Sequence, residues 1–297
     1  MQIALTLVGP DSDAASLAVA TLTPALAGAH ARVKEPRILG DGAVDLLVEA
    51  DAIAPVRAAA EAALAKWPVD VCVQPWNGRR KRLLIADMDS TIIGCECIDE
   101  LADFAGVKAQ VSAITERAMR GELDFEGALR ERVAMLKGLP LSALQQAYDE
   151  RVRLNPGART LVRTMAEHGA RCALVSGGFT FFTSRVAQAA GFHLDRANIL
   201  HHDDHGLSGT VGEPILGREA KREALISLCR ELKFDLSDSI AVGDGANDID
   251  MIQAAGLGVA FRAKAALKAV APVAIDHGDL TALLYLQGYR QTEFAAS

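Results

Sequence analysis

Residues 83–91 read Leu-Leu-Ile-Ala-Asp-Met-Asp-Ser-Thr, a short apolar run followed at once by two acids that stand two positions apart. Side chains at that spacing on an extended chain point the same way, and open α/β sheets bind ligands beyond the carboxyl ends of their strands. We therefore expect Asp87 and Asp89 to converge where a buried strand ends. Taken alone, the same residues also suit the capped start of a helix, with Asp89 or Ser90 as the N-cap.

Two converging carboxylates repel each other unless a cation or a shared proton offsets their charge. A hard divalent ion such as Mg²⁺ accepts carboxylates together with the oxygens of a substrate phosphate. With such an ion in place, one carboxylate can act as a nucleophile and its neighbour as a general acid and base. The motif therefore favours a metal-assisted catalytic site.

The composition limits the kinds of protein that this chain can be. With 297 residues, 50% of them hydrophobic, it can build a large core divided among one to three domains. It has no apolar run long enough for a membrane-spanning helix, and its N-terminus lacks the basic start of a signal peptide. Five scattered cysteines indicate reduced thiols, so we expect a cytoplasmic protein. A net charge of -7 does not favour binding to nucleic acid or to an anionic membrane. Any anionic substrate must therefore be held by basic residues close to it.

The first 78 residues follow the element order βαββαβ. Strand-like runs are expected at residues 2–8, 31–38, 43–50 and 69–74, with one helix ending near residue 27 and another over about 54–66. The Gly40-Asp41-Gly42 turn is a strong hairpin signal. This order is the ferredoxin-like split unit and resembles the ACT family of small regulatory domains. The resemblance implies that Gly9 lines an amino-acid site, although a turn also requires it, and that the unit regulates the protein or joins it into a homodimer.

The chain beyond this unit alternates strands with helices. A basic tract at residues 79–82 marks the boundary and is expected to be a solvated linker. Apolar strands at residues 83–86, 172–176, 239–243 and 258–261 indicate a parallel sheet wrapped by helices. A mostly helical stretch at about residues 96–153 exceeds one crossover connection and predicts a lid. We expect an α/β core of residues 79–94 and 155–297 with a helical cap of about residues 95–154.

Three further segments place polar groups at strand ends or helix starts of this core. Ser176-Gly177-Gly178 offers a hydroxyl and amides that can approach an anion closely. Lys221 opens a helical run, and residues 243–248 read Gly-Asp-Gly-Ala-Asn-Asp. Each segment has an ordinary explanation, as a capped turn, a solvated lysine or a calcium loop. Together with the first motif they have one chemical explanation, because phosphoryl transfer requires a nucleophile, a metal and cations around the phosphate.

These four segments resemble the four motifs of the haloacid dehalogenase superfamily and span about residues 83–260. The resemblance implies a Rossmann-like parallel sheet in which Asp87 attacks phosphorus and becomes an aspartyl phosphate. It also implies that Asp89 protonates the leaving oxygen and then activates water, which favours a phosphatase over a dehalogenase. The side chains of Asp87 and Asp244 and the main-chain carbonyl of Asp89 would bind Mg²⁺, while Asp248 would orient the metal shell.

The same resemblance assigns the residues that hold the phosphate. It implies that Ser176, Lys221 and the amides of Gly177 and Gly178 hold phosphate oxygens. Asn247 would bond the phosphate or a metal-bound water. Lys221 would also neutralise the paired carboxylates.

The segments after the first motif narrow the resemblance to the phosphoserine phosphatase family. Residues 92–100 match the stretch that follows the first motif in that family, and parts of residues 119–133 match its cap. Glu96 would pair with the substrate ammonium, and Arg132 would grip the carboxylate with two bonds. Met119 and Phe125 would wall the pocket.

The charges of the assigned residues agree with one substrate. O-phospho-L-serine carries an ammonium, a carboxylate and a phosphate, which Glu96, Arg132 and Lys221 match sign for sign. The resemblance therefore implies hydrolysis of O-phospho-L-serine to L-serine and phosphate, the last step of serine biosynthesis. Two alternatives stay open: a phosphotransferase that passes the phosphoryl group to an acceptor such as homoserine, and an amino-acid sensor whose catalysis is vestigial.

Other conspicuous residues have structural explanations. His201-His202-Asp203-Asp204-His205 has the composition of a metal site but is predicted to be a solvated hairpin tip. Cys95 and Cys97 stand too close along the chain to bridge well, so we expect them to pack near the cap hinge. Residues 292–297 are expected to fray.

Overall fold

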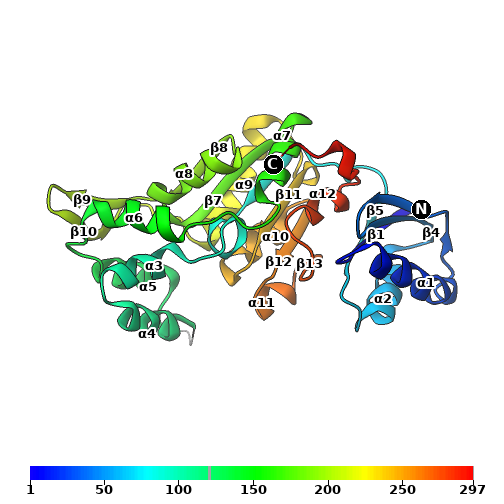
Figure 1. Ribbon diagram of the computed structural model, residues 1–297, viewed down its shortest axis with the longest axis horizontal. Helices are drawn as coiled ribbons and strands as arrows, with labels where there is room; N and C mark the ends of the chain where they lie inside the picture. Colours follow the sequence, from blue (N-terminus) through cyan, green and yellow to red (C-terminus); the bar gives the residue numbers. More distant parts are fainter. Residues whose placement is uncertain (120–121, 297) are drawn as a thin grey trace.

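The computed structural model describes residues 1–119 and 122–296, and its parts follow one another along the molecule (Figure 1). An N-terminal unit of two helices and an antiparallel sheet lies at one end. A parallel sheet with helices forms the middle, and a group of helices forms the other end. Among the described residues, no helix combines the length and the apolar character needed to cross a bilayer.

The N-terminal unit has the predicted order of elements. These are β1 (Gln2–Val8), α1 (Ser12–Gly28), β2 (Arg32–Val33), β3 (Arg37–Gly40), β4 (Ala43–Glu49), α2 (Ile53–Leu64) and β5 (Asp70–Pro75). Strand β1 lies between β4 and β5 and is antiparallel to both. Ile3, Leu5 and Leu7 alternate along β1 and pack with apolar side chains of α1 and α2. The sheet is compatible with an ACT-like domain.

The second predicted strand, residues 31–38, is wrong as a single element. The chain instead forms β2 and β3, which pair with opposite ends of β4. Pro36 lies in the break and has no N–H to donate to a ladder. The predicted turn at Gly40-Asp41-Gly42 does connect two paired strands, and Gly42 has a φ of 71°.

The predicted parallel sheet is confirmed. Its strand order is β13-β12-β11-β6-β7-β8, and each pairing is parallel. The strands are β6 (Leu83–Ala86), β7 (Arg171–Phe179), β8 (Leu194–Asn198), β11 (Ser239–Gly243), β12 (Leu257–Phe261) and β13 (Val273–Ile275). Because β6 lies between β7 and β11, the loops that follow these three strands meet at one edge of the sheet.

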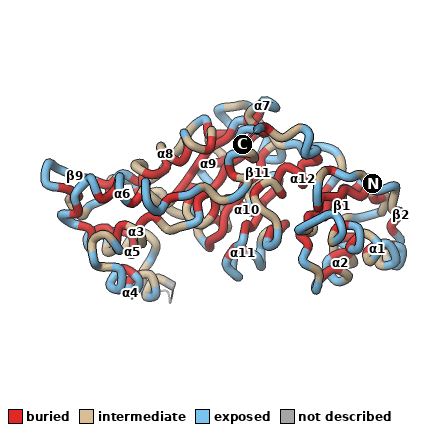
Figure 2. The backbone as a smooth tube through the Cα atoms, in the orientation of Figure 1, coloured by how far each residue is buried: buried red, intermediate tan, exposed pale blue. Residues whose placement is uncertain are grey.

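Helices cover both faces of this sheet, which is why its strands read as continuous apolar runs. Leu84 and Ala86 of β6 belong to the apolar cluster that includes α7, α8 and α12, whereas Leu83 and Ile85 belong to the cluster of α9, α10 and α11. The helices are α7 (Ala158–Glu167), α8 (Thr180–Ala190), α9 (Arg218–Leu232), α10 (Ile249–Ala254), α11 (Ala265–Lys268) and α12 (Ala282–Leu286). Figure 2 shows the buried backbone running through this sheet and into the N-terminal unit.

The stretch between β6 and α7 is helical, as predicted for a cap. It forms α3 (Cys97–Phe104), α4 (Lys108–Met119), α5 (Phe125–Ala134) and α6 (Leu141–Arg151). A hairpin of β9 (Leu200–Asp203) and β10 (Gly206–Val211) joins it, because Gly138 N–H donates to Leu207 O at 2.7 Å. The histidine-rich segment at its tip is exposed, as predicted.

The basic tract at residues 79–82 is not the solvated linker that we expected. Arg79 is buried, and its guanidinium donates to both carboxylate oxygens of the fully buried Asp45, one of them at 3.0 Å. Arg80 lies over the ring of Tyr289. Arg79 thus bonds the N-terminal unit and Arg80 contacts the C-terminal part of the chain, so the tract connects the two parts.

The prediction that the C-terminus frays is wrong for residues 292–296, and Ser297 lies outside the described residues. Phe294 packs against Tyr285, and Ala295 N–H donates to Thr164 Oγ1 at 2.8 Å. Glu293 accepts a bond from Arg80 at 2.6 Å. These contacts hold the end of the chain against α7 and α12.

Candidate active site

The first motif leaves the sheet at Asp87, directly after β6. The Asp87 N–H donates to Val242 O of β11 at 3.0 Å, and Asp87 Oδ1 accepts from Met88 N–H at 2.8 Å. Three residues later the chain turns sharply, because Ser90 has a φ of 57°. This turn leads the chain from the sheet towards the cap helix α3.

Asp87, Asp244 and Asp248 bring carboxylate oxygens within 4.8 Å of one another. Asp244 and Asp248 follow β11, and all three residues are buried. Lys221, from α9, is fully buried, and its Nζ lies 2.8 Å from Asp87 Oδ1 and 2.7 Å from Asp248 Oδ1. Three ionised carboxylates and one ammonium leave two negative charges in this cluster. Such an all-oxygen, doubly negative site suits a hard divalent cation.

Burial shapes the protonation of the cluster. It raises the pKa of Asp87 well above its ordinary value, and the neighbouring Asp248 raises it further, while Lys221 opposes both. Burial also raises the pKa of Asp244 to about 6. Burial alone would lower the pKa of Lys221, but Asp248 and Asp87 raise it, so this side chain stays charged.

Asp89 lies apart from that cluster. Its Oδ1 accepts from Cys97 N–H at 3.1 Å, and a Cβ at Gly178 would lie 2.8 Å from its Oδ2. Burial, followed by the charge of Glu96, raises the pKa of Asp89 to about 7. Lys221, expected to neutralise the pair Asp87 and Asp89, bonds Asp87 directly and acts on Asp89 only through its charge, which lowers the pKa of Asp89; its second bond goes to Asp248.

The predicted phosphate-binding groups stand beside these carboxylates. Ser176 is buried near the end of β7, and its Oγ accepts from Gly178 N–H at 2.9 Å. The glycines leave room for close contacts: a Cβ at Gly177 would lie 3.0 Å from the ring of Phe125. Asn247 is half-buried in the short helix η3 (Ala246–Asp248), which follows β11.

The cap supplies the remaining predicted residues. Glu96 is half-buried, and its Oε1 accepts from Ser90 Oγ at 2.7 Å. Arg132 is half-buried on α5, and its Nε donates to Ala128 O at 3.2 Å. Burial lowers the pKa of Arg132, while the charge of Asp99 and, after it, that of Glu96 oppose this shift. Met119 ends α4, but its side chain lies outside the described residues.

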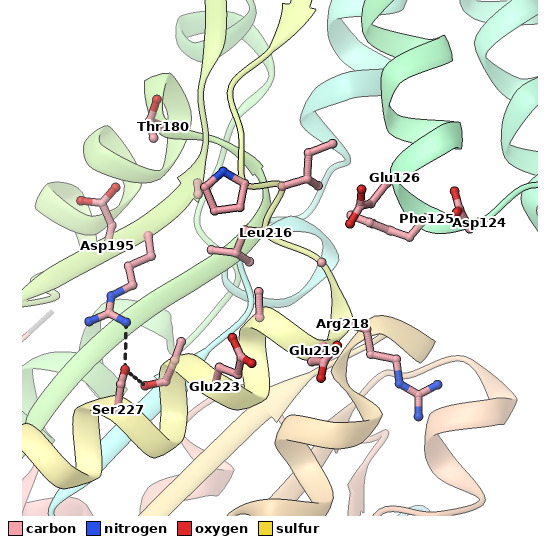
Figure 3. A pocket seen from close by; sticks show the side chains of 17 residues that line it. Asp124, Phe125, Glu126, Thr180, Asp195, Leu216, Arg218, Glu219, Glu223 and Ser227 are labelled. Carbon is pink, nitrogen blue, oxygen red and sulfur yellow. Dashed lines mark hydrogen bonds between the residues drawn. The ribbon is translucent and has the colours of Figure 1, made fainter.

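A cavity of about 870 Å³ opens between cap and core (Figure 3). The start of α5 and the segment 214–220 contribute to its wall, whereas Asp87 and Asp89 do not line it. Phe125 lies between the cavity and the end of β7, because its ring lies against Gly217, which lines the cavity, and against Gly177 of β7. The cavity therefore adjoins the site through this ring and is not itself the carboxylate centre.

Sequence reasoning missed two residues that support the site. Thr91 Oγ1 donates to Asp244 Oδ1 at 3.4 Å, and the D-x-D-x-T spacing could have indicated it. Asn155 Nδ2 donates to Thr91 O at 2.8 Å and to Ile93 O at 3.2 Å, where the chain returns from the cap. No local sequence signal marks Asn155, because its partners lie about 60 residues earlier.

Buried carboxylates around a lysine, at the carboxyl edge of a parallel sheet and beside a helical cap, define a phosphate-processing α/β hydrolase. The comparison with known families agrees with this class. Residues 81–256 match the model of the haloacid dehalogenase-like hydrolases. The chain belongs to this family.

Individual relatives are similar over much of the chain. A phosphoserine phosphatase of Polaromonas sp. is 47% identical over 210 residues, which are 69% of this chain and 89% of that protein. A haloacid dehalogenase family hydrolase of Salmonella enterica serovar Typhi superposes with a TM-score of 0.83 at 28% identity, covering 96% of this chain and 98% of its own. A phosphoserine phosphatase solved as a phospho-aspartyl intermediate analogue gives a TM-score of 0.65 at 40% identity, covering 69% and 98%.

Proposed function

We propose that this protein is a phosphoserine phosphatase that hydrolyses O-phospho-L-serine through an aspartyl phosphate on Asp87. One observation carries the proposal: a buried cluster of carboxylates surrounds Lys221, and the half-buried cap residues Glu96 and Arg132 add an acid and a base that interact electrostatically. Chemistry on the phosphate needs the cluster, and an amino-acid leaving group needs the two opposite charges. The similarity to a phosphoserine phosphatase at 47% identity supports the same substrate.

Asp87, Asp244 and Asp248 fit a divalent cation by donor type, burial and net charge. We propose that Asp87 and Asp244 bind Mg²⁺ through their side chains and Asp89 through its main-chain carbonyl, while Asp248 orients the site from its bond to Lys221. When bound, the ion supplies positive charge that offsets the acids and polarises the phosphate. Family membership supports Mg²⁺ as this ion.

The protein's own residues then divide the reaction. Asp87 Oδ attacks phosphorus, and the P–O bond to the serine oxygen breaks as that oxygen takes a proton from Asp89. Asp89, now ionised, accepts a proton from the water that attacks the aspartyl phosphate, which releases phosphate and restores Asp87. A pKa of about 7 suits Asp89 to both halves of the cycle.

Charges around the reacting centre hold the substrate during these steps. We propose that Lys221, Ser176, the amides of Gly177 and Gly178, and Asn247 hold the phosphate. Glu96 would take the ammonium and Arg132 the carboxylate, with Phe125 and Met119 as walls. The ring of Phe125 already lies against Gly177, so the cap can exclude bulk water from the site.

The first test is phosphate release from O-phospho-L-serine with Mg²⁺, beside phosphothreonine, an aryl phosphate and EDTA. We expect metal-dependent preference for phosphoserine, which Asp87→Asn abolishes while circular dichroism stays unchanged. If the protein cleaved the aryl phosphate but not phosphoserine, the proposed substrate would be wrong, while the proposed phosphatase reaction would stand. If Asp87→Asn retained the protein's biological role, the protein would be an amino-acid sensor.

A phosphotransferase would use the same residues, so only the acceptor separates it from a phosphatase. Adding homoserine to the assay tests this alternative. A phosphatase releases inorganic phosphate at an unchanged rate, whereas a transferase forms phosphohomoserine at the expense of phosphate.

We propose that residues 1–78 form an ACT-like unit with a regulatory or oligomerisation role, attached to a phosphatase unit of residues 79–297. In that division the core is residues 79–94 and 155–297, and the cap is about residues 95–154. The antiparallel sheet under two helices supports this view. Light scattering with and without L-serine tests whether the unit forms a homodimer. A cytoplasmic location, without nucleic-acid or membrane partners, completes the proposal.

A further inference from the structure

Ser90 is the strained residue of the loop after β6. Its φ of 57° and ψ of 0° lie in the left-handed region that residues other than glycine rarely adopt. Ser90 N–H donates to Cys95 O at 3.2 Å, and Ser90 Oγ donates to Glu96 Oε1 at 2.7 Å. The strained backbone therefore aims the hydroxyl at the proposed ammonium-binding acid. Strain of this kind persists where surrounding structure holds it in place, often at functional sites.

Glu96 does not make two other interactions that its position would suggest. It is the N-cap residue of α3, yet its side chain makes no capping bond to that helix. The charge of Glu96 opposes the fall that burial causes in the pKa of Arg132, but among the described residues no ion pair within 4.0 Å joins the two side chains. Arg132 bonds its own helix instead, through Ala128 O. The two opposite charges of the pocket are thus held apart.

We propose that Ser90 is a positioning residue that keeps Glu96 directed at the substrate ammonium. The inference rests on the proposed function and deepens it by assigning a determinant of amino-acid specificity. Without the hydroxyl, Ser90 no longer holds Glu96, so the ammonium meets a less well placed partner, while Arg132 keeps its bond to Ala128 O and its charge for the carboxylate. A supporting bond of this kind preorganises a binding group before the ligand arrives.

Three substrates separate this role from a general effect on the loop. O-phospho-L-serine carries both an ammonium and a carboxylate, O-phosphoethanolamine carries the ammonium alone, and phospholactate carries the carboxylate alone. Because Ser90 acts through Glu96, removing its hydroxyl should weaken binding only of the substrates that carry an ammonium. A merely structural role would affect all three substrates alike.

The experiment compares Ser90→Ala with the wild type on these substrates. Loss of a hydrogen bond to a charged group predicts about a tenfold fall in kcat/KM for the two ammonium substrates, through KM. The ratio of kcat/KM for phosphoserine over phospholactate should fall by the same factor. Ser90→Gly should match Ser90→Ala, because glycine also lacks the hydroxyl but adopts positive φ without strain. Ser184→Ala, which removes an exposed hydroxyl bonded within α8, is the matched control.

A second background tests that the effect passes through Glu96. In Glu96→Gln, adding Ser90→Ala should produce little further loss in phosphoserine KM, because the two residues act as one unit. Equal losses on all three substrates, or an unchanged ratio, would overturn the role of Ser90. A wild type that does not hydrolyse phosphoserine would overturn the proposed function itself, before any Ser90 variant is measured.

Discussion

At the scale of single residues, the site is organised around a buried cation. Lys221 has no exposed surface and bonds two carboxylates that belong to different loops. Isolated buried charges are costly, so each member of such a group depends on the others. Lys221 therefore contributes to stability as well as to phosphate binding, and the two roles can be measured separately.

Replacing Lys221 with Met leaves Asp87 and Asp248 without their buried counter-charge. We expect the free energy of unfolding to fall by about 3–5 kcal/mol in EDTA at pH 8, measured by urea titration. The raised pKa values of Asp87 and Asp244 mean that the folded state binds protons more tightly than the unfolded state, so stability falls as pH rises from about 4. At pH 5 these two acids carry less negative charge than at pH 8. The fall in unfolding free energy caused by Lys221→Met should therefore be smaller at pH 5.

Lys264 supplies the control for that measurement. Its ammonium lies 3.6 Å from Asp244 Oδ2, but its side chain is exposed, so Lys264→Met should change stability by less than about 1 kcal/mol. Equal losses in the two variants would show that burial of Lys221 does not matter.

Asp89→Asn tests the general acid through the leaving group. Serine leaves as a poor alkoxide and needs a proton, whereas p-nitrophenolate leaves without one. We expect kcat for phosphoserine to fall by about 10²–10⁴-fold and the formation of the aspartyl phosphate from p-nitrophenyl phosphate to fall far less. The burst of p-nitrophenolate in rapid mixing measures that step. Equal losses of phosphoserine turnover and burst rate would exclude Asp89 as the proton donor.

At the scale of elements, one of the contacts between the cap and the core is made by an aromatic ring. Phe125, at the start of α5, lies over Gly177 and Gly217, where added Cβ atoms would each come within 3.0 Å of the ring. The glycines therefore set how closely the cap approaches the sheet. Gly217 has a φ of -112°, so its lack of a side chain serves this contact and not a special backbone conformation.

Gly217→Ala should move the Phe125 ring by a few tenths of an ångström and hold the cap slightly open. We expect KM for phosphoserine to rise severalfold with little change in unfolding free energy, and Phe125→Leu in the same chain to restore part of the loss. Steady-state kinetics measures both. Gly28→Ala is the control, because a Cβ there meets no atom within 4 Å. Unchanged kinetics in Gly217→Ala would mean that the cap closes without this contact.

The sequence predicted these elements unevenly, for physical reasons. The four strand-end segments were found because a strand that is buried on both faces leaves a continuous apolar run before its polar end. Asn155 was missed because it bonds main-chain carbonyls distant in sequence, which any polar residue could do. The segment at 31–38 was misread because β propensity outweighed Pro36. The prediction for Arg79 was wrong because a run of basic residues does not indicate that one of them pairs with a buried acid elsewhere in the chain.

At the scale of the whole molecule, the N-terminal sheet is covered on both faces by its own chain. Leu5 and Leu7 face α1 and α2, whereas Val8 and Cys72 belong to the apolar cluster of the core. Gln74 Nε2 donates to Leu286 O at 2.7 Å, and the Asp70 carboxylate accepts N–H groups from residues 276–278. The unit is therefore docked through a sheet face and not tethered by a flexible linker.

The five thiols report on this docking. Burial raises the pKa of Cys72 and of Cys172 to about 12, and it also raises that of Cys229, whereas Cys95 is partly exposed. At pH 8 we expect a thiol reagent to modify Cys95 in the native protein and all five cysteines in denaturant. Peptide mass spectrometry identifies the modified sites. Rapid native labelling of Cys72 would contradict the docked arrangement.

Arg79→Gln should release the unit and expose Cys72 alone. The substitution removes a counter-charge of the buried Asp45, and loss of one partner from a buried pair typically costs about 3–5 kcal/mol. Because Cys72 lies on the docked face, its labelling rate should rise by at least tenfold, while Cys172 inside the parallel sheet stays protected. Arg82→Gln is the control, since that side chain is mostly exposed and lies over Phe234. If Cys72 and Cys172 became reactive together, the two parts would unfold as one cooperative body, and the buried ion pair would stabilise the whole chain instead of an interface.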